Sequence, residues 1–249
     1  MLQYLHADLW RIGRRIPRWV IWILSMVIGV AVIVSASGKK TFNYVELGNS
    51  METVLRILPA FMAMFNLYFV YEDDMQVKTM QIAIGRGTGR LAIIFSKWLQ
   101  MVLLSIIDCV SLILVMNLTG QLLKGVVLRD HIARGIGAQA ISTVLTVAVM
   151  TAIVMIFLFN SMHVGIMQIV FLVLCIKPFT LILNSLETRH EFLAELQLSN
   201  FMPGKNLDAI KQMITVGQFG VRNITVIIIY CILGMGITYM IFAKKELDF

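Results

Sequence analysis

Two short stretches of the sequence contain residue types that resemble parts of known catalytic sites. HEFLAE, at residues 190–195, begins like the zinc-protease motif HExxH, in which two histidines one helical turn apart hold the metal. Ala194 stands where the second histidine is required, so the ligand pair is incomplete. PGKN, at residues 203–206, lacks the upstream glycine and the Ser or Thr of a phosphate-binding loop. The sequence therefore predicts no enzyme, no metal site and no cofactor held by this chain.

Three charged side chains fall inside apolar stretches. Asp108 lies near the middle of one, where a charge costs several kcal/mol. Two interpretations stay open: it lines a polar pathway or pairs with a cation, or it is a protonated carboxyl bonded to a neighbouring helix, Ser105 or Ser111. Lys177 is one candidate partner, and it is equally able to extend towards the headgroups. Arg56, just inside the outer end of another stretch, is expected to do the latter.

The composition indicates that lipid is the solvent for most of the chain. Hydrophobic residues make up 59% and charged residues 14% of the 249 positions, whereas soluble proteins average about 45–50% and about 25%. The net charge of +7 comes from cations beside apolar runs, without a nucleic-acid-binding motif, which favours membrane orientation over nucleic-acid binding. Cys109, Cys175 and Cys231 lie inside apolar runs, so we expect free, buried thiols.

The apolar runs predict an all-α membrane protein with six transmembrane helices in a single domain, 1–249. Each run supplies the roughly 20 residues that cross about 30 Å of hydrocarbon as a helix. Four residues join the fourth run to the fifth, which predicts a tight helical hairpin. The first run exceeds the usual length of a signal-peptide core and is expected to be a retained anchor. The predicted spans are 19–37, 54–71, 98–118, 137–159, 164–183 and 224–243.

Positive charge predicts the orientation of the spans. Arg11, Arg14, Arg15 and Arg18 precede the first span and favour a cytoplasmic N-terminus. With six spans, the C-terminus and the loop after the second span are then cytoplasmic as well. Several cations in the assigned outer loops make this bias moderate. Apolar residues recur at three- and four-residue steps over 1–18, which predicts an interfacial helix in the headgroup layer.

The loop between the second and third spans combines acids, a helical run and glycines. Glu72, Asp73 and Asp74 are placed where a new helix would begin, and Asp74 and Lys78 have the favourable four-residue spacing. GRGTGR, at 85–90, would then end a short amphipathic helix. The residues alone leave two readings open, an ordinary polar connection or a rigid element that receives force from a partner.

The stretch YEDDMQVKTMQIAIGRGTGRLAIIFSKWL resembles the characteristic loop of the type-2 permeases of bacterial ATP-binding-cassette (ABC) transporters. That loop begins with an acidic pair, continues as T-h-x-h-h-h-x-x-G-h-x-R, where h is hydrophobic, and ends with a lysine near the next span. The sequence departs from it at Gly89, where many relatives have a polar residue. The six-span plan also resembles this family. The matching positions are Glu72, Asp73, Thr79, Gly87, Arg90 and Lys97.

The resemblance implies a transmembrane permease subunit of the bacterial cell membrane. Residues 72–90 would form a coupling helix that docks on a separate cytoplasmic ABC ATPase, which would bind the ATP and magnesium. Residues 184–222 would form short re-entrant helices on the outer side. A second permease chain, identical or a sister, would complete the pathway. The implied coupling residues are Glu72, Asp73, Asp74, Lys78, Thr79, Gly87 and Arg90.

The expected function is export of a hydrophobic or amphipathic substrate, such as an antimicrobial peptide or a drug, for secretion or self-immunity. Aliphatic spans and 17 methionines suit such a client, although methionine also serves as ordinary packing. Two alternatives stay open: a membrane scaffold that transports nothing, and an ion-coupled carrier that uses Asp108 and Lys177.

Overall fold

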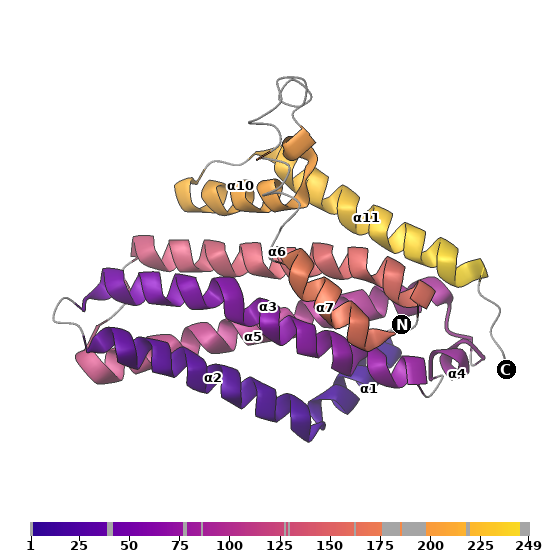
Figure 1. Cartoon of the computed structure of the whole chain (residues 1–249), viewed down its shortest axis with the longest axis horizontal. Helices are drawn as coiled ribbons and strands as arrows, with labels where there is room; N and C mark the ends of the chain where they lie inside the picture. Colours follow the sequence, from indigo (N-terminus) through magenta and orange to yellow (C-terminus); the bar gives the residue numbers. More distant parts are fainter. Residues whose placement is uncertain are drawn as a thin grey trace.

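The computed structural model describes the chain in several stretches, and every element within them is helical (Figure 1). The described residues are 2–38, 42–76, 79–85, 87–126, 128, 130–161, 163–175, 185, 198–217 and 220–244. The elements are α1 (Leu2–Gly13), α2 (Ile16–Ser37), α3 (Tyr44–Gln76), α4 (Thr79–Gly85), α5 (Arg90–Lys124), α6 (Asp130–Ser161), α7 (Val164–Cys175), the 3-10 helix η1 (Leu198–Phe201), α10 (Pro203–Val216) and α11 (Val221–Lys244).

Five helices of the described chain are long and apolar enough to cross a membrane, namely α2, α3, α5, α6 and α11. They bear out the expected all-α, membrane-spanning class. The expected fifth span, 164–183, is described as far as Cys175, and the 12 residues of α7 are too few to cross on their own. The count of six spans, Lys177 and the first part of the re-entrant segment lie outside the described residues.

Two of the spanning helices extend well beyond the predicted limits. We expected spans at 54–71 and 98–118, whereas α3 has 33 residues and α5 has 35. At 1.5 Å per residue each is about 50 Å long, against about 30 Å of hydrocarbon. Hydropathy detects only the part that meets lipid, so the polar ends were assigned to loops. The expectation that a new helix begins at Glu72 is wrong, because α3 continues to Gln76.

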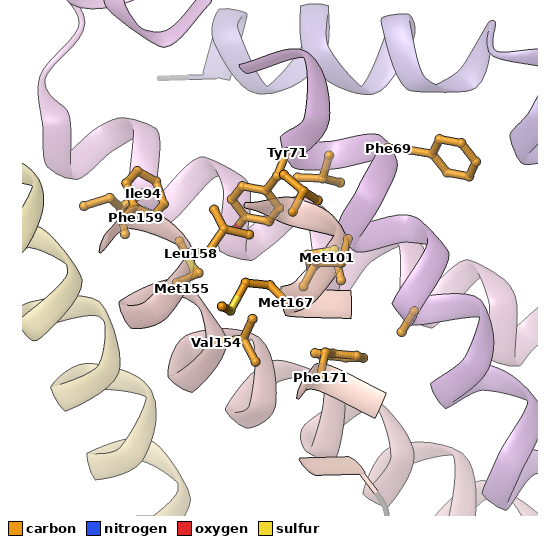
Figure 2. Close-up of a cluster of buried hydrophobic side chains, with 14 of the residues drawn as sticks. Phe69, Tyr71, Ile94, Met101, Val154, Met155, Leu158, Phe159, Met167 and Phe171 are labelled. Atoms are coloured by element: carbon orange, nitrogen blue, oxygen red, sulfur yellow. The ribbon is translucent and has the colours of Figure 1, made fainter. Parts of the chain in front are cut away.

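Helix α6 is at the centre of the bundle. It contacts α3, α5, α7, α10 and α11, and Figure 1 shows α2, α3 and α5 on one side of it and α10 and α11 on the other. The ends that carry α1, α4 and the last turn of α11 lie together, and we call this the α1 end of the bundle. Near it, Phe159 of α6 makes edge-on ring contacts with Tyr71 and Phe242, at centroid distances of 6.3 and 4.9 Å. This aromatic cluster joins α3, α6 and α11, and Figure 2 shows Tyr71 and Phe159 within it.

The contact between α11 and α6 depends on a glycine. A Cβ atom built on Gly234 would lie 2.7 Å from the Ala152 carbonyl oxygen and 2.9 Å from its carbonyl carbon. Backbone atoms cannot rotate away, so a side chain at this position would push the helices apart. Gly236, two residues later in the same helix, has nothing within 4 Å of its Cβ position.

We predict that Gly234→Ala destabilises the protein by about 1–3 kcal/mol, the usual cost of overpacking. The matched control Gly236→Ala should be neutral or slightly stabilising, because alanine is the better helix former by up to about 1 kcal/mol. Thermal unfolding of both variants in the same detergent measures the difference. Equal midpoints for the two variants would contradict the close approach of α11 to α6.

Candidate functional site

A buried lysine joins three helices at the α1 end. Lys97 lies two turns into α5, and its side chain is 0% exposed. Its ammonium group forms ion pairs with Asp8 of α1 and Asp74 of α3, and it donates a hydrogen bond of 3.0 Å to the Val70 carbonyl oxygen. Gln100 Nε2 donates a second bond to Asp8, at 2.9 Å. A buried charge must be paired, so Lys97 fixes the positions of α1 and α3 relative to α5.

Two arginines extend this cluster towards the surface. Arg11 bridges Asp8, at 2.5 Å, and Asp73, at 2.6 Å. Arg15 also pairs with Asp73, and its Nη1 lies 4.0 Å from Glu72 Oε2. Asp8, Arg11, Arg15, Glu72, Asp73, Asp74 and Lys97 together form what we call the ionic junction.

The ionic junction explains why α3 does not end before its acids. Three carboxylates in the last turns of a helix face the negative end of the helix dipole, which disfavours them. Here Lys97 and the arginines of the α1–α2 connection supply compensating positive charge. The helix therefore continues through Glu72, Asp73 and Asp74, where local sequence rules favour a break.

The phenol of Tyr4 lies beside the ionic junction. Lys97 Nζ is 5.6 Å from the centre of its ring, within the range of a cation–π contact. Burial raises the pKa of the Tyr4 hydroxyl far above its usual value, and the negative charges of Asp74 and Asp8 raise it further. Tyr4 is therefore neutral at physiological pH, and Lys97 is neutralised by the aspartates and not by a phenolate.

The side chain of Arg90 contacts the last spanning helix, α11, and is not free in the loop between α4 and α5. Its Nη1 donates hydrogen bonds of 2.7 and 2.6 Å to the carbonyl oxygens of Phe242 and Ala243, and its guanidinium lies 5.5 Å from the centre of the Phe242 ring. These carbonyls belong to the last turn of α11, where a cation is favourable to the helix dipole. Arg90 thus ties the first residue of α5 to the end of α11.

The predicted break after the short helix is present. Gly87 has φ = 89°, a left-handed conformation that favours glycine, and its N–H donates to the Ile84 carbonyl at 2.9 Å. Helix α4 buries Met80 and leaves Ile82 54% exposed, so it has an inner face and an outer face that carries an apolar side chain. Thr79 is its first residue, and Lys78 lies outside the described residues.

The intramembrane residues are separate from the ionic junction. Asn66 of α3 donates a hydrogen bond of 2.7 Å to the buried Asp108 carboxyl, and Ser111 Oγ donates to the Asp108 backbone carbonyl at 3.0 Å. Asp108 therefore accepts a hydrogen bond from a neighbouring helix, while its protonation and its pairing with Lys177 both stay predictions. Arg56 is 66% exposed and lies 3.4 Å from Glu52, which also pairs with Lys211 of α10.

Sequence reasoning missed Asp8 and Asn66. The sequence did hold a sign that Asp8 is buried, because it lies on the same face of α1 as Leu5 and Ile12, which are both buried. Asn66 was an isolated amide within an apolar span. Arg11 and Arg15 were assigned to membrane orientation alone, and the structure places both in the ionic junction.

Neither a protein-family model nor a curated protein matches this sequence. Within the described stretches, no group of three or more His, Cys, Asp or Glu side chains could hold a metal ion. Cys109, Cys175 and Cys231 are free thiols.

We predict that Lys97→Met destabilises the protein by about 3–5 kcal/mol, because it removes the cation that pairs with the buried Asp74 and leaves Asp8 with Arg11 alone. Lys124→Met is the matched control: Lys124 is exposed at the far end of the same helix, and its loss should change stability by less than about 0.5 kcal/mol. The triple variant Lys97→Met, Asp8→Asn and Asp74→Asn should recover much of the loss, since it removes the unpaired charges. Thermal unfolding in detergent distinguishes these outcomes, and a Lys97→Met variant as stable as the control would contradict a structural role for the ion pairs.

Proposed function

We propose that this chain is the permease subunit of a bacterial ABC exporter, with α4 as the element that docks on a separate cytoplasmic ATPase. The observation that carries the proposal is the setting of α4: a short helix with an exposed apolar side chain, Ile82, between the ends of two spanning helices. A surface of this kind suits insertion into a groove of another protein.

The contacts around α4 give a route for force. A displacement of α4 acts on α3 and α5 through its two short connections. Lys97 couples α3 and α5 to α1, and Arg90 couples α5 to α11. The helix ends at the α1 end would then move together when the partner ATPase binds or hydrolyses ATP. Because a ligand shifts such an equilibrium only through different affinities for its states, the nucleotide must change the contact with α4.

The proposed substrate is hydrophobic or amphipathic, such as an antimicrobial peptide or a drug, moved outward for export or self-immunity. Many aliphatic side chains are exposed on α2, α5 and α11, and the chain has 17 methionines. Both features support an apolar client. A second permease chain, identical or a sister, would complete the pathway. The bacterial cell membrane, with both termini in the cytoplasm, is the setting that agrees with the proposal.

The clearest test of docking is Ile82→Glu. Alanine at Glu72, Asp73 or Arg90 would remove contacts within the chain as well as any contact with a partner. A loss of docking in those variants could therefore have either cause, which is not so for the exposed Ile82 side chain. We predict that an ABC ATPase co-purifies with the wild-type chain from native membranes in mild detergent. Ile82→Glu should lower its yield by about tenfold or more, because a charge would replace an apolar anchor. Val216→Glu, at a 68% exposed residue at the end of α10, should leave the yield unchanged.

Topology provides an independent test. We predict that Ile82→Cys, with Cys109, Cys175 and Cys231 replaced by serine, reacts with a membrane-impermeant maleimide in inside-out vesicles and not in intact cells. Labelling in intact cells would remove α4 from any contact with a cytoplasmic motor. A wild-type chain that brings down no ATPase would favour the scaffold or the ion-coupled carrier.

A further inference from the structure

A cavity of about 540 Å³ lies between α6 and α7 on one side and the η1–α10 junction and α11 on the other. Its size falls within the range of about 300–1,000 Å³ that is typical of small-molecule sites. Met150, Phe157, Val170, Val173, Met202 and Tyr230 are among its lining residues. The cavity shares none of its lining residues with the ionic junction.

The described lining offers a ligand no free polar side chain. Tyr230 is the one lining residue with a polar side chain among those described, and its hydroxyl donates to the Phe201 carbonyl oxygen at 3.0 Å. A peptide backbone or a sugar in this cavity would lose its hydrogen bonds to water without replacement. An aliphatic chain loses none. Met150 and Met202 add unbranched, adaptable side chains that suit a flexible ligand.

The cavity opens at the surface of the bundle, and we call this opening its mouth. Phe157, Ile169 and Val173 line the cavity and are also 50%, 66% and 47% exposed on the outer surfaces of α6 and α7. Phe157 lies within α6, a helix long and apolar enough to cross a membrane, so in a bilayer the surface around this mouth would meet acyl chains. Water is disfavoured in an apolar cavity, and an empty cavity of this size would forfeit the contacts of its lining atoms. An acyl chain from the surrounding bilayer would fill the cavity without water and would restore the contacts of its lining atoms.

We propose that this cavity binds the acyl chain of a membrane phospholipid. The chain enters between Phe157 and Val173 and fills the space where α11 separates from α6. The backbones of these helices come into close contact at Gly234, one turn beyond Tyr230, and the lipid completes their packing on the other side of that contact. The bound chain thereby stabilises the position of α10 and α11 against α6 and α7, and this role does not depend on an ATPase partner.

The test uses vesicles of phosphatidylcholine in which a small fraction of the lipid carries a diazirine near the end of one acyl chain. The full-length protein is reconstituted and irradiated, and the labelled residues are identified by mass spectrometry. Met150 is the diagnostic position, because it is 4% exposed and yet lines the cavity, so that a lipid chain reaches it only from inside. Exposed residues of α11, such as Ile232 at 60%, report labelling by bulk lipid.

A matched pair of variants separates binding in the cavity from contact with bulk lipid. Val173→Phe fills the mouth, whereas Val110→Phe makes the same change at a residue of α5 with nearly the same exposure, 49% against 47%. We expect Met150 to be labelled in the wild type and in Val110→Phe. In Val173→Phe we expect the labelling of Met150 to fall by about fivefold or more, because the larger side chain overpacks the mouth of the cavity. Labelling of Ile232 should be the same in all three, which also shows that each variant is inserted.

Two results would overturn the proposal. One is labelling of Met150 no higher than the background of other buried residues. The other is labelling that Val173→Phe leaves unchanged while Ile232 reports normal insertion. Strong labelling of Met150 by a photoreactive amphipathic peptide, without labelling by the lipid, would assign the cavity to a transported client and also reject the lipid.

Discussion

The burial of one ammonium group determines the arrangement of a whole end of the molecule. Lys97 has lost all contact with solvent, and it is stabilised by Asp8 from α1, Asp74 from α3 and a backbone carbonyl of α3. Removing two charges from water costs a large desolvation free energy, and only a close, well-oriented ion pair offsets it. A helix lying elsewhere in the headgroup layer would leave Lys97 and Asp74 without Asp8, so α1 has one favourable position.

That constraint joins the ends of α3 and α5 to α1. Once α1 is fixed, Arg11 and Arg15 are held over Asp73, and α3 continues through its acids. Arg90 adds the end of α11 to the same assembly. Helix α4 is therefore connected to helix ends that have little freedom to move separately. In the proposed permease, this is the support that a helix docked on a partner ATPase would require.

The features that were predictable from the sequence are those that depend on neighbours along the chain. The apolar runs, the amphipathic stripe of α1 and the glycine break after α4 each follow from residues within a few positions. The ionic junction does not: Asp73 is 58 residues from Arg15 and Lys97 is 89 residues from Asp8. Local rules placed Glu72–Asp74 at the start of a helix because the compensating cations are remote in sequence. The bond between Asn66 and Asp108, 42 residues apart, was unpredictable for the same reason.

The helices on the two sides of α6 are held to one another by different forces, and this difference bears on how the protein can move. On one side, directional ion pairs join α5 to α1 and α3 at the α1 end. Towards α10 and α11, the contacts are mainly apolar, with Leu207, Ile210, Ile227 and Cys231 packed on Val149. Apolar contacts are non-directional, so helices slide on them at a lower penalty than ion pairs allow. Arg90 holds α11 at the α1 end, whereas its first half, beside the cavity at Tyr230, is held mainly by apolar contacts with α6 and α10. An acyl chain bound in the cavity would add apolar contacts to that half of α11.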